Sequence, residues 1–315
     1  MHRFHTAFFL VLISSAVAFS GCRDAAKESK KDVPRLTANV RMQDVSFHSS
    51  ALQREMSYRV VLPKTINGNK LPVIYLLHGG GGGFRDWSNY SDVAHYAERG
   101  LILVMPEGGS SYYTNSAARP QERFEDYILN DLIADVETRF PAATDRSRRS
   151  IMGASMGGFG AIKAALKRPD LFVFAGGISS AIDVPTRPFS IKRIGQWRHH
   201  RSIFGEWQGQ AQMQNDPYVL AQSADPAKTP YIYITCGDKE GLLAANRRFA
   251  ALLSKRQFAH EFHVVPGGHD WNQWNAILPS YFDKLSQVMS KQPEHVQRES
   301  PPRGRNMLAQ RGSAG

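Results

Sequence analysis

A short turn between an apolar run and a helix-forming stretch constrains this chain more than any other feature. The run Ser150–Met152 leads into Gly153-Ala154-Ser155-Met156-Gly157. Glycines two residues before and after a serine permit a sharp strand-to-helix turn that holds the serine in a strained backbone conformation and exposes its hydroxyl. Glycines also occur where a helix merely packs closely on a sheet. The pattern predicts a strand, a turn and a helix, with Ser155 as candidate nucleophile.

A glycine-rich turn further upstream offers free backbone amides. The apolar run Leu71–Leu77 predicts a buried strand, and five glycines follow His78 directly after it. A phosphate-binding loop is the rival interpretation, but no Gly-Lys-Ser/Thr follows and the glycines do not open a helix in G-x-G-x-x-G spacing. We expect instead that the amides of Gly80 and Met156 form an oxyanion hole for a substrate carbonyl.

Two later strand ends supply a candidate acid and a candidate base. The run Tyr231–Cys236 is followed by both Asp238 and Glu240, and the run Glu261–Val265 is followed by a loop that contains His269. Functional groups of α/β sheets lie at the carboxyl ends of their strands. The chain order serine, acid, histidine is that of a hydrolase triad. The sequence therefore predicts His269 as the general base.

In these motifs the chain resembles the putative-esterase branch of the α/β-hydrolases. That branch contains tributyrin, feruloyl and acetyl-xylan esterases, S-formylglutathione hydrolases and mycolyltransferases. The resemblance runs from about Val40 to about Leu285 and is carried by the stretches Leu71–Gly79, Leu101–Pro106, Ser111–Thr114, Glu125–Ile128, Gly153–Gly160, Cys236–Gly237 and Gly267–Trp271. It implies an α/β-hydrolase fold, with Ser155 as nucleophile, His269 as general base, and Gly80 and Met156 as oxyanion donors.

The chain departs from that family at the triad acid. Relatives usually carry an aspartate in a Cys-Gly-x-x-Asp pattern, where this chain has Glu240. Glu240 holds the matching position, whereas Asp238 has the usual side chain. Both stay candidates for the acid.

The alternation of strand and helix patterns predicts an α/β fold with a mostly parallel central sheet flanked by helices. With 315 residues, of which 42% are hydrophobic, the chain is long enough for one sizeable catalytic domain, expected at residues 39–290. An antiparallel hairpin turned at Ser49-Ser50 is expected from Val40–Phe47 and Glu55–Leu62, and a further strand at Leu171–Ile178. Helices are expected at Asn130–Thr138, Gly158–Lys167, Leu242–Arg256 and Asn272–Ser290.

The periodicity fails in residues 179–230, which we interpret as a short, polar insertion that roofs the active site. Its basic side chains, with Trp197 and Trp207, indicate either a site for an acidic or sugar-bearing substrate or a solvated surface. His199 and His200 are interpreted as ordinary residues. Tyr112, Tyr113 and Trp197 are the candidate substrate-binding residues, because their rings would stack on a sugar or aryl group.

The amino end predicts export. Residues 1–21 contain an apolar run of signal-peptide length, which ends in Phe19-Ser20-Gly21-Cys22 and resembles a bacterial lipobox. Lipidation of Cys22 would tether the protein to a membrane, facing the periplasm or the cell exterior, with residues 22–38 as a flexible stalk. The alternative is a soluble secreted protein.

Charge and composition exclude several other classes of partner. The net charge of +11 lies partly in the tail 291–315, expected to be disordered, and no nucleic-acid-binding motif accompanies it. The histidines, carboxylates and cysteines show no zinc-type spacing and no nucleotide fingerprint occurs, so neither a metal nor a cofactor is expected. Cys236 is expected to remain unpaired. The sequence does not predict an oligomeric state.

Together these features predict a serine carboxylesterase that acts through an acyl-enzyme. The expected substrates are short-chain acyl or acylated-carbohydrate esters, of small-molecule or polysaccharide origin. The alternative is an acyltransferase of mycolyltransferase type, which uses the same triad but passes the acyl group to a sugar hydroxyl. A catalytically inactive binding protein on the same fold is disfavoured by the complete set of triad residues.

Overall fold

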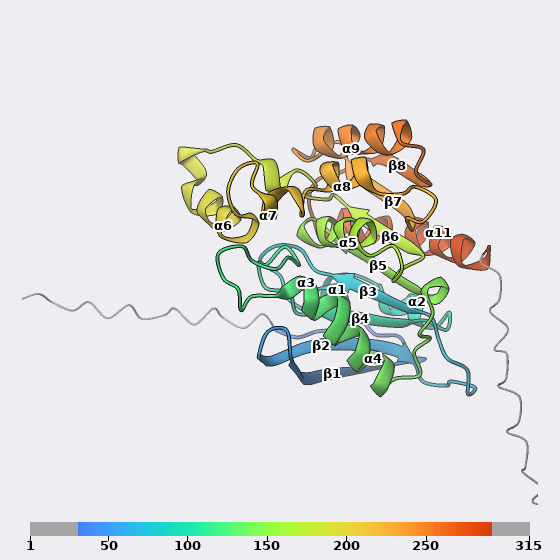
Figure 1. Ribbon diagram of the computed structural model, residues 1–315. Coiled ribbons are helices and arrows are strands. Elements are labelled where there is room, and N and C mark those ends of the chain that lie inside the picture. The colour runs from blue at the N-terminus through green and yellow to red at the C-terminus, as the bar shows by residue number, and fades with distance from the viewer. Residues whose placement is uncertain (1–30, 292–315) are drawn as a thin grey trace, which may run out of the picture. The chain divides into compact units, whose positions relative to one another are not determined.

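An eight-stranded sheet organises the chain in the computed structural model, which describes residues 31–291 (Figure 1). The strand order is β1-β2-β4-β3-β5-β6-β7-β8. The hairpin β1–β2 is antiparallel, as predicted, and β2 also pairs antiparallel with β4, whereas the other neighbours are parallel. The predicted mostly parallel α/β sheet is confirmed. The strands are β1 (Val40–Ser49), β2 (Arg54–Pro63), β3 (Val73–Leu77), β4 (Ile102–Pro106), β5 (Arg149–Ala154), β6 (Phe174–Ile178), β7 (Tyr231–Gly237) and β8 (His260–Val265).

Helices cover both faces of this sheet (Figure 1). The α-helices are α1 (Asp86–Tyr90), α2 (Ala94–Ala97), α3 (Phe124–Asp126), α4 (Ile133–Arg139), α5 (Met156–Lys167), α6 (Ile194–Phe204), α7 (Gln210–Met213), α8 (Pro217–Ser223), α9 (Leu243–Lys255), α10 (Trp271–Ala276) and α11 (Leu278–Ser290). A π-helical segment (Tyr127–Leu132) joins α3 to α4, and short 3-10 turns lie at Arg146–Arg148, Val184–Thr186 and Ile191–Arg193.

The central strand β3 shows why the sheet needs helices on both sides. All five of its residues are buried, and successive side chains enter opposite cores because a strand alternates its side chains between its two faces. Val73 and Tyr75 pack with residues of α4 and α5, whereas Ile74 and Leu76 pack with residues of α2 and α11. A strand with no polar face is typical of parallel sheets.

Two of the four predicted helices differ from the structure by more than a shift of one or two residues at an end. The helix expected from Asn130 begins instead at Phe124, because the side chain of Asn115 accepts hydrogen bonds from the amides of Glu125 and Asp126 at its first turn. The helix expected over Asn272–Ser290 is divided into α10 and α11 at Ile277. Pro279, in the first turn of α11, has no N–H with which to continue α10.

The strand expected from Leu171 also begins later, at Phe174, because the amide of Leu171 closes a turn onto the carbonyl of Arg168. The predicted signal peptide, the lipidation site Cys22, and nearly all of the basic tail lie outside the described residues, as does the first part of the stalk. Within residues 31–291, no helix has both the length and the apolar character needed to cross a bilayer.

Candidate active site

The turn around Ser155 joins β5 to α5 and holds the serine in a strained conformation, with φ 56° and ψ −111°. The Ser155 amide donates to the Ile178 carbonyl at 2.8 Å. A Cβ on Gly157 would lie 2.1 Å from the Leu77 carbonyl oxygen, and a Cβ on Gly153 would lie 2.5 Å from the Gly157 carbonyl carbon. Only glycine fits at these two positions, because strand β3 passes so close beneath the turn.

Three side chains from distant segments form one chain of hydrogen bonds. Ser155 Oγ lies 2.9 Å from His269 Nε2, and His269 Nδ1 lies 2.7 Å from Glu240 Oε2. Ser155 follows β5, Glu240 follows β7, and His269 lies on the loop after β8. The parallel strands bring these three positions to the same edge of the sheet. The arrangement lets the imidazole accept the serine proton at Nε2 while Nδ1–H donates to the carboxylate.

The carboxylate that contacts His269 belongs to Glu240 and not to Asp238. Asp238 Oδ1 instead accepts the amide of Gly267 at 2.9 Å and so supports the loop that leads to the histidine. Glu240 has a side chain that is 1% exposed, and its second oxygen accepts from Ser179 Oγ at 2.5 Å and from the Gly237 amide at 2.9 Å. Both carboxylate oxygens of Glu240 are therefore fixed.

The Glu240 carboxylate is kept ionised by its partners. Burial raises the pKa of this carboxyl, but hydrogen bonds from His269, Ser179 and the Gly237 amide outweigh burial and leave the pKa below its ordinary value. The contribution of Ser179 is not apparent from the sequence motifs. The sequence signal that could have identified Ser179 is its position: it directly follows β6, at the same edge of the sheet as the other site residues.

A cleft of about 390 Å³ opens over Ser155 and His269, and Gly80 and Met156 also line it. Gly80 lies in a tight turn, closed by the Gly82 amide on the Gly79 carbonyl at 3.2 Å. Met156 is the first residue of α5, so its amide has no partner inside the helix. Neither amide donates to another residue within the described range 31–291. The two predicted oxyanion donors thus face the same cleft as the serine.

The buried His78 supports the turn that carries Gly80. Its Nδ1 lies 2.8 Å from the Gly79 carbonyl, and its Nε2 accepts the Gly108 amide at 2.9 Å. These partners place the ring proton on Nδ1. His78 therefore connects the glycine-rich turn after β3 to the loop after β4.

The three predicted substrate-binding residues have different surroundings. Tyr112 lines the cleft. Tyr113 does not, and its predicted role is wrong: it is 3% exposed, its hydroxyl donates to the His78 carbonyl at 3.0 Å, and its ring packs against Gly160. Trp197 lines a neighbouring cavity of about 300 Å³, which shares Arg187 and His200 with the cleft.

The insertion contributes more to the cleft than its sequence indicated. His199 and His200, interpreted above as ordinary residues, both line the cleft, together with Gln196 of the same helix. Burial, and the positive charge of Arg187 next to it, lower the pKa of His200 to about 4, so this ring is neutral at pH 7. Helical spacing on α6 is the signal that would have grouped these residues on one face.

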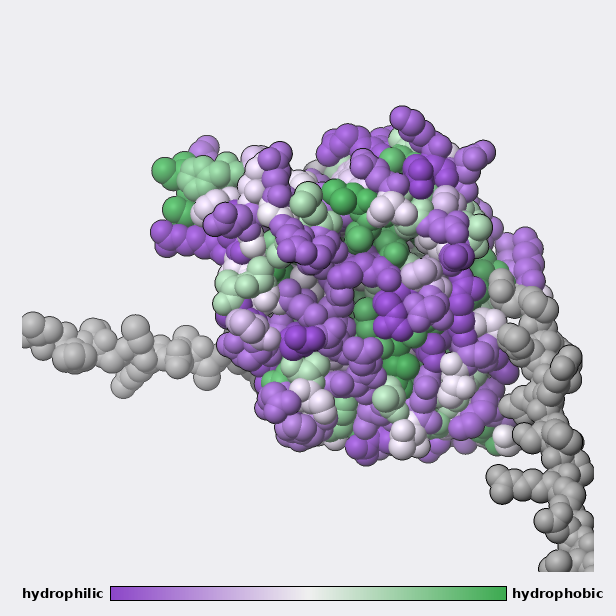
Figure 2. Space-filling model, in the orientation of Figure 1, coloured by the Kyte–Doolittle hydropathy of each residue, from purple (hydrophilic) through white to green (hydrophobic). Residues whose placement is uncertain are grey.

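The expected polar character of the insertion is only partly correct. Figure 2 shows apolar side chains gathered at the outer end of the insertion, in the region of α6. Large apolar side chains with high exposure in this segment are Phe189, Ile191, Ile194, Trp207, Met213 and Val219. Elsewhere in the described residues, Cys236 is buried and unpaired, and no group of three His, Cys, Asp or Glu side chains is placed to hold a metal ion.

A protein family and individual proteins of known activity match the sequence. The sequence model of the family described as "Putative esterase" matches residues 49–285. An acetyl esterase of Caldicellulosiruptor saccharolyticus is 26% identical over 263 residues, which cover 78% of this chain and 98% of that protein.

Solved structures share the fold. Fluorophosphonate-binding serine hydrolase F of Staphylococcus aureus superposes with a TM-score of 0.67 at 24% identity, over 80% of this chain and 99% of that one. A ferulic acid esterase gives a TM-score of 0.68 at 23% identity, with the same coverage of each chain. These neighbours have the α/β-hydrolase fold, and the family match covers most of the chain. The protein is therefore a member of the putative esterase family, a carboxylic ester hydrolase on an α/β-hydrolase fold.

Proposed function

We propose that the protein is a serine carboxylesterase that hydrolyses short-chain acyl or acylated-carbohydrate esters, of the acetyl or feruloyl type. The proposal assigns Ser155 as nucleophile, His269 as general base and Glu240 as the acid that orients the histidine. The observation that carries it is the continuous hydrogen-bond chain from Ser155 Oγ through the His269 ring to Glu240 Oε2, at 2.9 and 2.7 Å.

In the acylation step, Ser155 Oγ attacks the ester carbonyl carbon while His269 Nε2 takes the hydroxyl proton. Glu240 holds the proton on Nδ1 and stabilises the imidazolium that forms. The tetrahedral intermediate then expels the alcohol, which takes its proton from His269 Nε2. In the second step His269 removes a proton from water, whose oxygen attacks the acyl carbon. The bond from that carbon to Ser155 Oγ then breaks, Oγ takes the proton back from His269 Nε2, and the carboxylic acid and free Ser155 result.

The negative charge of each tetrahedral intermediate needs donors that are already in place. The amides of Gly80 and Met156 suit this role because both border the cleft and neither has a competing partner among the described residues. Met156 also begins a helix of 12 residues, whose amino end favours an anion. Losing one such donor costs about two to three orders of magnitude in kcat in serine hydrolases.

The size of the cleft supports a small acyl group. A volume of about 390 Å³ is at the lower end of the range for small-molecule sites. The similarity to an acetyl esterase supports an acetyl group in particular. A larger alcohol or aryl part of the substrate would extend past Tyr112 toward the cavity that Trp197 lines. Arg187 lies at the junction of the two spaces, where it would meet a polar or anionic group.

We also propose, from the sequence alone, that the enzyme is exported and anchored to a bacterial membrane through lipidated Cys22. An extracytoplasmic location would bring the cleft to esters of extracellular carbohydrates. The expectation of a soluble secreted enzyme differs only in the anchor.

Substitution of Ser155 tests the proposed chemistry. Ser155→Ala should lower kcat for 4-nitrophenyl acetate by about four to six orders of magnitude and abolish covalent labelling by a fluorophosphonate. Ser110→Ala is the matched control for labelling, because Ser110 lines the same cleft without contacting His269. A Ser155→Ala protein that keeps most of its activity would refute the proposal. If instead Ser155→Ala is inactive, a panel of acetyl, butyryl and feruloyl esters and acetylated xylan identifies the substrate class.

A further inference from the structure

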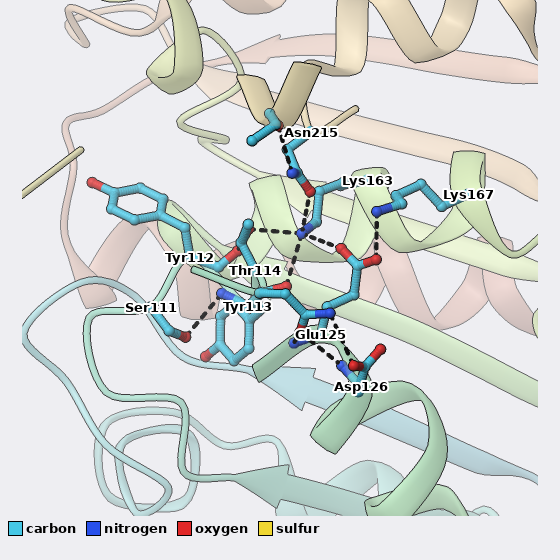
Figure 3. A network of polar contacts seen from close by, with 11 residues as sticks. Ser111, Tyr112, Tyr113, Thr114, Glu125, Asp126, Lys163, Lys167 and Asn215 are labelled. Atoms are coloured by element: carbon cyan, nitrogen blue, oxygen red, sulfur yellow. Dashed lines mark hydrogen bonds and ion pairs between the residues drawn. The ribbon is translucent and has the colours of Figure 1, made fainter. Parts of the chain in front are cut away.

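Two of the family-like stretches, Ser111–Thr114 and Glu125–Ile128, have no part in the chemistry proposed above, yet they meet inside the protein. Figure 3 shows both converging on the ammonium group of Lys163. Lys163 Nζ donates to the Tyr113 carbonyl at 2.9 Å, to Thr114 Oγ1 at 2.7 Å and to Glu125 Oε2 at 2.6 Å. The lysine belongs to α5, eight residues, or about two helical turns, after Ser155.

This lysine is a buried charge with several partners. Its side chain is 1% exposed, and Asn215 Oδ1, from the insertion, lies 3.3 Å from Nζ as a fourth acceptor. Glu125 also pairs with Lys167 at 2.5 Å. An ammonium has three N–H donors, so the Tyr113, Thr114 and Glu125 oxygens take one each and the more distant Asn215 oxygen can only share one. Burying this charge is costly unless those donors are paired, so the geometry around Nζ is tightly determined.

The segment that Lys163 binds has an unfavourable backbone. Tyr112 has φ 53° and Tyr113 has φ 50°, a backbone region that residues other than glycine rarely adopt. Ser111 Oγ accepts the Tyr113 amide at 3.0 Å, and Thr114 Oγ1 donates to the Tyr112 carbonyl at 2.9 Å. Lys163 completes this set, since it donates both to the Tyr113 carbonyl and to the same Thr114 hydroxyl.

The strained segment carries a wall of the cleft. Tyr112 borders the same space as Ser155 and His269. Its ring forms a T-shaped pair with the ring of Phe159, and its hydroxyl lies 3.1 Å from His200 Nε2 in the insertion. A change in the backbone at Tyr112 would therefore move a substrate-facing ring without displacing the serine or the histidine.

We propose that Lys163 is a positioning residue, whose ammonium holds the Ser111–Thr114 segment in the strained backbone that presents Tyr112 to the substrate. Through its contact with Asn215, the same ammonium also helps to hold the insertion in place next to this segment. This role rests on the proposed function, because it requires that the cleft binds the ester. It concerns binding of the larger substrates, since a small acetyl ester need not reach Tyr112.

Lys167→Met is the matched control for Lys163→Met. Both variants remove one of the two cations that pair with Glu125, but Lys167 makes no hydrogen bond to the Ser111–Thr114 segment in the described structure. The probes are ethyl acetate, which has no aryl group, and methyl ferulate, with kcat and KM measured separately by titration of the released acid and the melting temperature recorded for each variant.

We expect Lys163→Met to raise KM for methyl ferulate by about tenfold and to leave kcat for the acetate within about threefold of wild type. Lys167→Met should change both values by less than about threefold. If Lys163→Met does not fold, Thr114→Val keeps the side-chain shape and removes the link to the Tyr112 carbonyl. It should raise KM for the ferulate in the same direction.

A pH profile separates positioning from a purely structural role. Burial lowers the pKa of Lys163 to about 8, with Glu125 and Asp126 opposing the shift and the nearby Lys167 adding to it. Loss of this proton leaves fewer donors for the segment, so kcat/KM for methyl ferulate should fall as the pH rises through about 8. Because the pKa is below its ordinary value of 10.5, deprotonation of this group favours the folded state between those two values. The melting temperature should therefore not fall because of Lys163 in that window.

The fall in kcat/KM above pH 8 should be absent in Lys163→Met. The proposal is overturned if Lys163→Met and Lys167→Met lose activity on both esters equally, in proportion to a lowered melting temperature, or if the two pH profiles coincide. If wild-type protein hydrolyses neither ester and Ser155 takes no fluorophosphonate label, the proposed function itself fails and the positioning role falls with it.

Discussion

Replacing Glu240 by glutamine tests the triad most sharply, because the structure specifies how the new amide would sit. Oε1 of Glu240 accepts from Ser179 Oγ at 2.5 Å and from the Gly237 amide at 2.9 Å. These two donors would select the amide oxygen of the glutamine at that place. The amide nitrogen would then face His269 Nδ1, where Oε2 now lies at 2.7 Å.

A donor at that position changes the tautomer of the histidine. His269 Nδ1 would have to accept, so the ring proton would move to Nε2, which faces Ser155 Oγ at 2.9 Å. A protonated Nε2 cannot take the serine proton, and the imidazolium would also lose its carboxylate. We expect kcat to fall by about two to four orders of magnitude, which is about 2.7 to 5.4 kcal/mol of transition-state stabilisation.

Asp238→Asn is the matched control for this experiment. Its Oδ1 accepts the Gly267 amide, and an asparagine oxygen can still do so. We expect kcat within about fivefold of wild type. The assay is steady-state hydrolysis of 4-nitrophenyl acetate near neutral pH, with the melting temperature measured in parallel. An equal or larger loss in Asp238→Asn would refute the assignment of Glu240 as the triad acid.

Three further expectations concern the turn, the cleft and the anchor. Gly157→Ala should destabilise the protein by about 3 kcal/mol or more, because its Cβ would lie 2.1 Å from the Leu77 carbonyl oxygen. A lower melting temperature would show this loss, whereas the control Gly195→Ala, in open space on α6, should not lower it. The value of kcat/KM for 4-nitrophenyl acetate or butyrate should exceed that for the palmitate by at least roughly tenfold, or about 1.4 kcal/mol, and a preference for the long chain below its critical micelle concentration would reject a small acyl site. Cys22→Ser should release the protein from the membrane fraction of a bacterial host, whereas retention that still requires detergent would argue against a lipid anchor.

The fold was largely predictable because the patterns behind it are local. Buried strands such as Val73–Leu77 are apolar throughout, and a strand of a parallel sheet covered on both faces requires that. The G-x-S-x-G spacing of Gly153 and Gly157 can be recognised within a few residues, although the atom that excludes a side chain at Gly157 is the Leu77 carbonyl oxygen of strand β3. Helix boundaries were harder to predict from the sequence. The helix at Phe124 starts where it does because of Asn115, on a separate loop.

The sequence also placed Ser155 and His269 on the correct strand ends, but it did not decide which of two carboxylates contacts the histidine. Asp238 and Glu240 are two residues apart, and their motifs do not distinguish which one meets the histidine. Only the folded chain does, because Ser179 and the Gly237 amide hold one oxygen of Glu240 while the Gly267 amide takes Asp238.

Tertiary structure likewise separated Tyr112 from Tyr113. The two are the same residue type, adjacent in the chain and alike in backbone φ, yet one faces the cleft and the other is buried against Gly160. The sequence by itself determined the strands, the sharp turn and the serine on it, because the apolar runs and the glycine spacing that predict them each lie within a few residues. Which acid contacts the histidine, which tyrosine lines the cleft and what Lys163 binds were decided by contacts between segments tens of residues apart, which no local pattern records.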